Sequence, residues 1–251
     1  APYLETDMGY SQSKWVAEQL VFAARSRGLA VNIYRPGFIM GDTTTGVANV
    51  NDFVCRLIKG CIDAGCYPDL PRQRKDFVPV DYVSAAVTHI LLDPANLGRT
   101  YHLVPPLAES PDLQGFFELM RGAGHALQRL PFASWLERVV DSVGRHSVDS
   151  PLLPLIPMLT EKVHRGLTRW ELYEGMPVFD DTNTRQALAD TSLSCPPLDA
   201  RLLRVYLAFL DAGSGEMEPT SEVDSEVRAK LEGNLGGRLR GLRRARGEPA
   251  R

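Results

Sequence analysis

The order of helical and strand patterns in the first hundred residues is the feature that most constrains the fold. Apolar residues recur there alternately at helical spacing and in short β-branched runs. The expected elements are, in order, helix 9–27, strand 30–34, helix 47–64, strand 77–80, helix 82–92 capped by Asp81, and strand 101–104. This alternation is typical of a parallel, doubly wound α/β sheet.

The pattern changes at Pro105, after which strand signals cease and apolar residues recur at helical spacing. The sequence therefore predicts an α/β chain whose residues 1–104 form the C-terminal half of a Rossmann-type doubly wound sheet, with residues 43–75 able to pack against the second unit. Residues 105–212 are expected to form a mainly helical subdomain. Residues 213–251, which carry six arginines in the last fourteen positions, are expected to form a disordered basic tail.

Composition excludes several classes of partner and site. The formal net charge of -3 gives no general reason to bind nucleic acid or an anionic membrane, and no run of about eighteen apolar residues predicts a membrane span. The four cysteines lack the paired spacing of a zinc site, so we expect reduced, buried thiols and no metal. A cytoplasmic protein is the resulting expectation.

The first helix carries a possible catalytic pair. Tyr10 and Lys14 are four residues apart and so lie on one helical face. A lysine cation favours the tyrosinate, which makes the phenol a better proton donor to a carbonyl oxygen that receives a hydride. The same ammonium can hold a nicotinamide ribose. An exposed Tyr/Lys pair without function is the alternative, because this spacing often arises by chance.

The order of the motifs that follow this pair resembles extended short-chain dehydrogenase/reductases. Those motifs are the turn 35–41 and the segment 77–83. The resemblance implies that Tyr10 is the acid, that Tyr10 and Lys14 contact the cofactor, and that the turn lies against the nicotinamide. The turn residues implied to bind cofactor are Arg35, Pro36, Gly37, Phe38 and Ile39. Gly37 suits this role because a turn without a side chain lets the backbone approach a planar ring.

The helical half resembles thioester reductases, the terminal reductase domains of nonribosomal peptide synthetases, aminoadipate reductases and carboxylate reductases. The segments that carry the resemblance, in order, are 124–135, 150–155, 179–184 and 195–199. The family implies NADPH-dependent reduction of an acyl or peptidyl thioester to an aldehyde or alcohol. It also implies a partner, the phosphopantetheinylated carrier protein or domain that bears the thioester.

The phosphate-binding side of a dinucleotide domain has no counterpart in the sequence. No glycine-rich turn follows a strand pattern, and the family's upstream catalytic Ser or Thr is not found. We therefore expect the N-terminal βαβ units to be absent and the chain alone to be inactive. Two alternatives remain: a redox-inactive, Dieckmann-type cyclase on the same fold, which the retained Tyr10 disfavours, and a non-catalytic interaction module.

Overall fold

The parallel strands occur as three separate pairs in the computed structural model, which describes residues 9–146, 150–175 and 177–212. Each pair joins strands that are distant in sequence. They are β1 (Ile33–Pro36) with β5 (Thr100–Leu103), β2 (Phe38–Met40) with β4 (Phe77–Pro79), and β3 (Cys66–Asp69) with β6 (Gln128–Pro131). A short antiparallel pair, β7 (Lys162–His164) with β8 (Leu167–Thr168), completes the described strands. The chain is thus a mixed α/β fold, as the sequence predicts.

Gly37 marks the point where the chain changes its pairing partner. The Gly37 amide donates to the Leu103 carbonyl at 3.0 Å, whereas the next amide, of Phe38, donates to the Asp76 carbonyl at 3.1 Å. A Cβ at Gly37 would lie 1.9 Å from that Asp76 oxygen. Glycine is therefore required here by a close approach within the chain itself, a reason different from the ring contact that the sequence suggested.

The helices surround these pairs. They are α1 (Gly9–Ser26), α2 (Phe53–Ala64), α3 (Val80–Leu92), α4 (Leu113–Gly122), α5 (Phe132–His146), α6 (Ile156–Thr160), α7 (Arg169–Leu172), α8 (Thr182–Ala187) and α9 (Ala200–Asp211). The expected start of α2 at residue 47 was wrong, because Asp52 caps the helix by accepting from the Cys55 amide at 2.8 Å. The expected cap at Asp81 was also wrong. Its carboxylate accepts from the Thr43 amide and hydroxyl instead.

The expectation that strands end at residue 105 was wrong, because β6 lies in the second half. Its sequence, Gln-Arg-Leu-Pro, is mostly exposed and has no apolar alternation. Pairing with the buried strand β3 holds it extended, and that pairing joins residues about sixty positions apart. A pattern read along the sequence contains no signal for such a contact.

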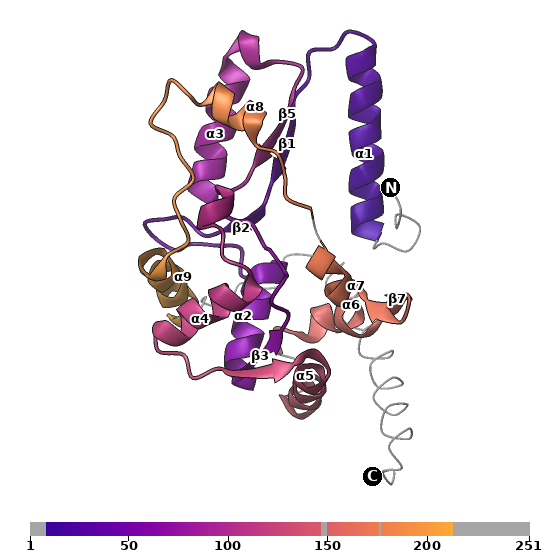
Figure 1. Cartoon of the computed structure of the whole chain (residues 1–251), viewed down its shortest axis with the longest axis vertical. Helices are drawn as coiled ribbons and strands as arrows, with labels where there is room; N and C mark the ends of the chain where they lie inside the picture. The colour runs from indigo at the N-terminus through magenta and orange to yellow at the C-terminus, as the bar shows by residue number, and fades with distance from the viewer. Residues whose placement is uncertain (1–8, 147–149, 176, 213–251) are drawn as a thin grey trace.

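The described residues bury two apolar clusters of unequal size. The larger one lies in the lower part of Figure 1 and draws on α2, β3, α4, α5, α6, α7 and α9. The smaller one joins α3, β4 and β5 to residues around Leu188 and Cys195. Residues 43–75 supply α2 and β3 to the larger cluster, while the domain boundary near residue 104 stays a prediction. The predicted tail, 213–251, lies outside the described residues.

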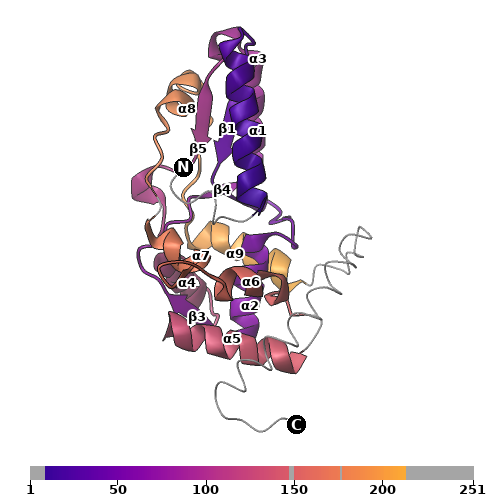
Figure 2. The same ribbon diagram turned by 90° about the vertical axis from the view of Figure 1, so that its right-hand side faces the viewer.

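Helix α1 stands apart from both clusters. None of its residues is buried. It lies alongside β1, whereas α8 lies on the β5 side of the same pair, as both views show (Figures 1 and 2). The contacts that hold it are polar and are described next, because the predicted catalytic pair lies on this helix.

Candidate functional site

One face of α1 carries the predicted pair together with an anchoring carboxylate. Tyr10, Lys14 and Glu18 follow at intervals of four residues, which places them in one row along the helix. The Lys14 ammonium lies 5.5 Å from the centre of the Tyr10 ring, and the Tyr10 side chain is 67% exposed. The phenol is thus open to a ligand, and the ammonium lies beside its ring.

Glu18 ties this row to the sheet through Arg35. Arg35 Nε donates to Glu18 Oε2 at 2.8 Å, and its Nη2 donates to Oε1 of the same carboxylate. The remaining terminal nitrogen of Arg35 lies 3.1 Å from His102 Nε2 on the neighbouring strand. Arg35 therefore connects α1 to β5. A direct role of this side chain in cofactor binding stays a prediction.

The orientation of α1 places Tyr10 at the carboxyl ends of the parallel strands. At the other end of the helix, Arg25 donates to the carbonyls of Val31 and Arg99, which precede β1 and β5. The helix thus runs antiparallel to β1, and Tyr10 lies about 12 Å beyond Glu18 at 1.5 Å per residue. Ligands of open α/β sheets bind at this carboxyl edge.

The other residues of the predicted turn have separate environments. Phe38 packs against Phe53 and Phe77, with ring centres 6.0 and 6.3 Å away, so its side chain packs against the larger apolar cluster. Pro36 and Ile39 are exposed. The structure therefore leaves two of these side chains accessible to a ligand and uses the others within the chain.

A pocket of about 350 Å³ opens beyond the carboxyl end of β5. Its lining contains both apolar and charged side chains. The lining residues are Val104, Pro105, Pro106, Leu107, Val178, Phe179, Arg74, Asp76, Asp180, Asp181 and Arg185. No motif in the sequence indicated this pocket, because its lining comes from three separate segments of the chain, 74–76, 104–107 and 178–185.

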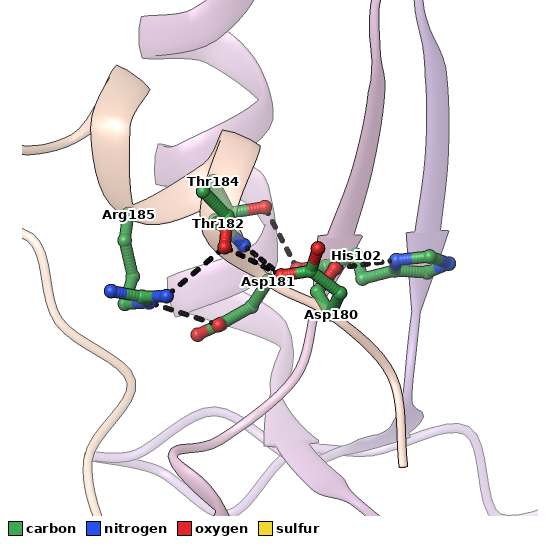
Figure 3. Close-up of polar contacts among 6 residues, drawn as sticks. All are labelled: His102, Asp180, Asp181, Thr182, Thr184 and Arg185. Atoms are coloured by element: carbon green, nitrogen blue, oxygen red, sulfur yellow. Dashed lines mark hydrogen bonds and ion pairs between the residues drawn. The ribbon is translucent and has the colours of Figure 1, made fainter. Parts of the chain in front are cut away.

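Polar contacts fasten the segment before α8 to β5 (Figure 3). His102 Nδ1 lies 2.8 Å from the Asp180 carbonyl oxygen, and the Thr184 hydroxyl donates to the His102 carbonyl at 2.8 Å. The Asp180 carboxylate accepts from the Thr182 amide and hydroxyl, which lowers the pKa of Asp180. Asp181 pairs with Arg185 in the same segment. These contacts hold one wall of the pocket against the sheet.

Lys75 is a buried cation that no sequence pattern singled out. It lies in the charged run Arg-Gln-Arg-Lys-Asp, which reads as a solvated loop, yet the residue is 1% exposed. Its ammonium lies 4.3 Å from the centre of the Trp170 ring, 4.8 Å from that of Tyr173 and 5.1 Å from that of Phe38. Burial lowers the pKa of Lys75 to about 7.

The chemistry of Tyr10 and Lys14 fits the nicotinamide side of a dinucleotide. An exposed phenol and an exposed ammonium on one helical face offer the donors that a ribose and a carbonyl oxygen require. Gly37 does not contribute a cradle, because the Asp76 carbonyl occupies the space next to its Cα. The fit to the nicotinamide side of a dinucleotide therefore depends on Tyr10 and Lys14.

The described residues offer no metal site and no membrane-spanning helix. No cluster of three or more His, Cys, Asp or Glu side chains there could hold a metal ion. The four cysteines are buried and free, as expected, and burial raises the pKa of Cys55 and of Cys195 to about 12. Among the helices described, none combines the length and apolar character that crossing a membrane would demand.

Comparison with known proteins identifies relatives of one kind. Residues 3–87 match the NAD-binding family model described as "Male sterility protein". The nonribosomal peptide synthetase FrzA of a Cladobotryum species is 49% identical over 213 residues, which are 83% of this chain and 20% of that protein. Aldehyde reductase lnaA of Aspergillus flavus is 44% identical over 88% of this chain and 22% of its own length.

Solved structures identify the same kind of relative. The terminal reductase domain from the myxalamid PKS-NRPS pathway superposes with a TM-score of 0.70 at 38% identity, covering 85% of this chain and 51% of that domain. The chain thus spans about a fifth of the curated relatives and about half of the reductase domain. By both sequence and fold, the chain is a relative of the terminal reductase domains of nonribosomal peptide synthetases and of aldehyde reductases.

Proposed function

We propose that this chain supplies the proton donor and the substrate pocket of an NADPH-dependent thioester reductase. The reaction is the reductive release of an acyl or peptidyl thioester from a carrier protein, to an aldehyde or an alcohol. The observation that carries the proposal is the exposed Tyr10 phenol beside the Lys14 ammonium, at the carboxyl edge of the parallel strands. Reductase-domain relatives that cover most of the chain support it.

Each residue of the pair has a distinct role. NADPH, when bound, supplies the hydride that adds to the thioester carbonyl carbon. Tyr10 donates its phenolic proton to the carbonyl oxygen as negative charge develops there. Lys14 stabilises the resulting tyrosinate and binds the ribose hydroxyls. Expulsion of the carrier's thiol from the reduced carbon then leaves an aldehyde, and a second reduction gives an alcohol.

We assign the acyl or peptidyl group to the 350 Å³ pocket beyond β5. Its apolar lining residues can cover a hydrocarbon or aromatic portion, while its charged ones offer both donors and acceptors. The thioester would arrive on the phosphopantetheine arm of a carrier domain. We further propose that an upstream half-domain binds the pyrophosphate and adenosine, and that the enzyme acts in the cytoplasm.

The test is Tyr10→Phe in the full-length enzyme that carries this chain. The variant lacks only the transferable proton, so we expect single-turnover reduction of a carrier-bound thioester to fall about 10²- to 10⁴-fold. NADPH affinity, measured by calorimetry, should stay within about threefold of wild type, because one phenol contributes a small part of dinucleotide binding.

Tyr34→Phe is the matched control, since it removes a phenol from β1 that hydrogen-bonds to Asn32 rather than facing α1. Its rate should equal that of wild type. Full activity in Tyr10→Phe would remove the phenol from the mechanism. Cofactor-independent product release in the wild type would favour a cyclase, and no turnover with any carrier-bound thioester would favour an interaction module.

A further inference from the structure

His102 lies between the acid-bearing helix and the pocket wall. It stands in β5 directly opposite Arg35 of β1. One ring nitrogen, Nε2, lies 3.1 Å from Arg35 Nη1, and the other, Nδ1, lies 2.8 Å from the Asp180 carbonyl oxygen. Both polar atoms of the ring are therefore engaged. Figure 3 shows the contact on the Asp180 side.

The partners of the ring determine its tautomer. A guanidinium N–H can only donate, so Nε2 accepts from Arg35. Nδ1 must then carry the proton, which it donates to the Asp180 carbonyl oxygen. The Phe179 ring lies 5.2 Å from the imidazole, centre to centre, and covers it on the pocket side. The imidazole is thus fixed in orientation by two directional bonds and one packing contact.

Each bond of the ring leads to a different part of the proposed site. On one side, Arg35 also hydrogen-bonds to Glu18. Glu18 shares a helical face with Lys14 and Tyr10. Because α1 buries no residue, this polar contact has a large share in setting the position of the helix. On the other side, Asp180 belongs to the segment that walls the pocket.

We propose that His102 is a positioning residue of the reductase site, which holds the wall formed by residues 178–181 in register with the acid-bearing helix α1 through Arg35 and Glu18. The inference rests on the proposed function of Tyr10 and of the pocket. His102 itself touches neither substrate nor cofactor. It fixes the distance between the group that donates the proton and the wall that places the thioester, and such alignment strongly affects rate.

Two substitutions separate the two bonds. The amide nitrogen of asparagine reaches the position of Nδ1, so His102→Asn keeps the bond to the Asp180 carbonyl and loses Arg35. Glutamine reaches the position of Nε2, so His102→Gln keeps the bond from Arg35 and loses Asp180. His89 on α3 is exposed and remote from these contacts. His89→Asn and His89→Gln are therefore matched controls.

In the full-length enzyme, we expect one variant to change mainly kcat and the other mainly KM. His102→Asn loosens the anchoring of Arg35, and through it of α1, and should lower kcat about tenfold with KM nearly unchanged, whereas His102→Gln loosens the pocket wall and should raise KM about tenfold with kcat nearly unchanged. The His89 variants should match wild type. Identical kinetics for the two His102 variants, or wild-type constants in both, would overturn the proposal.

A second measurement does not depend on activity. Amide hydrogen exchange in the chain itself should rise in α1 for His102→Asn and in residues 178–184 for His102→Gln. If the enzyme reduces no thioester but exchange rises in α1 for one variant and in residues 178–184 for the other, the link through His102 stands and the proposed function fails. If exchange rises equally in both segments, or in neither, the positioning role fails whatever the enzyme does.

Discussion

Helices α1 and α2 follow each other in sequence and have opposite environments. α2 buries six of its twelve residues and is closed by a side-chain cap at Asp52 and a left-handed glycine at Gly65. α1 is longer, with eighteen residues, and buries none of them. Both carry apolar residues at helical spacing, but only those of α2 face a described core.

Amphipathic spacing therefore predicts a helix but does not indicate what covers its apolar face. Trp15, Val16, Leu20 and Phe22 are exposed on α1. The reductase domain to which the chain is similar is about twice as long as the part that the chain covers. In an enzyme of that length, we expect the upstream half-domain to cover these side chains. In the chain alone, polar contacts join α1 to Arg35 of β1 and to the carbonyls of Val31 and Arg99, which precede β1 and β5.

Shortening one apolar residue in each helix should give the largest difference between α1 and α2. Ile58 in α2 is 1% exposed and Leu20 in α1 is 67% exposed. We expect Ile58→Ala to lower the free energy of unfolding by about 2–5 kcal/mol, since it removes buried methyl groups and leaves a cavity. Leu20→Ala should change it by less than about 0.5 kcal/mol. Urea denaturation of the chain measures both, and a comparable loss in Leu20→Ala would show that α1 is packed.

The well-packed region that contains α2 also contains Lys75, a cation whose burial is unfavourable. We expect Lys75→Met to raise the free energy of unfolding by about 1–4 kcal/mol at pH 6, as an apolar side chain fills the space among three rings. Cation–π attraction between those rings and the ammonium opposes this gain and limits its size. Urea denaturation at pH 6 measures it, and a less stable methionine variant would show that the rings favour the charge more than burial disfavours it.

The sign of the pH dependence follows from the lowered pKa of Lys75, about 7 against an ordinary 10.5. Between these values the unfolded chain binds more protons than the folded one, so wild-type stability rises with pH there. The advantage of Lys75→Met should therefore shrink from pH 6 to pH 9. Cysteines and tyrosines titrate equally in both proteins and cancel in the difference. An advantage that grows with pH would contradict the assignment.

The features that the sequence predicted are local ones. Helix 9–27 and the Tyr10/Lys14 face depend on residues four positions apart, and the structure has that helix and that proximity. The mixed α/β class followed from alternating patterns over a hundred residues. The motif order also led to the reductase relatives, which sequence and fold comparisons confirm. Whether Tyr10 and Lys14 are catalytic stays a prediction.

The features that the sequence did not predict depend on contacts across the chain. His102 alternates with Tyr101 and Leu103 in β5, so the pattern places it on the opposite face from the core, but its partners Arg35 and Asp180 are 67 and 78 residues away. Lys75 is buried by three rings contributed from two other segments. No periodicity within β5 or the 72–76 loop could have indicated either environment.

The smallest expected effect is that of Glu18→Gln, which weakens the tether of α1. Arg35 and Glu18 are 39% and 24% exposed, so solvent screens their attraction, and glutamine can still accept one hydrogen bond. We expect the free energy of unfolding to fall by at most about 1 kcal/mol, and by less in 1 M salt. Hydrogen exchange of the α1 amides should rise while that of α2 stays constant, because the Arg35–Glu18 pair holds α1 and does not support the larger apolar cluster. A loss above about 2 kcal/mol, or faster exchange in α2, would show that the two helices are stabilised together.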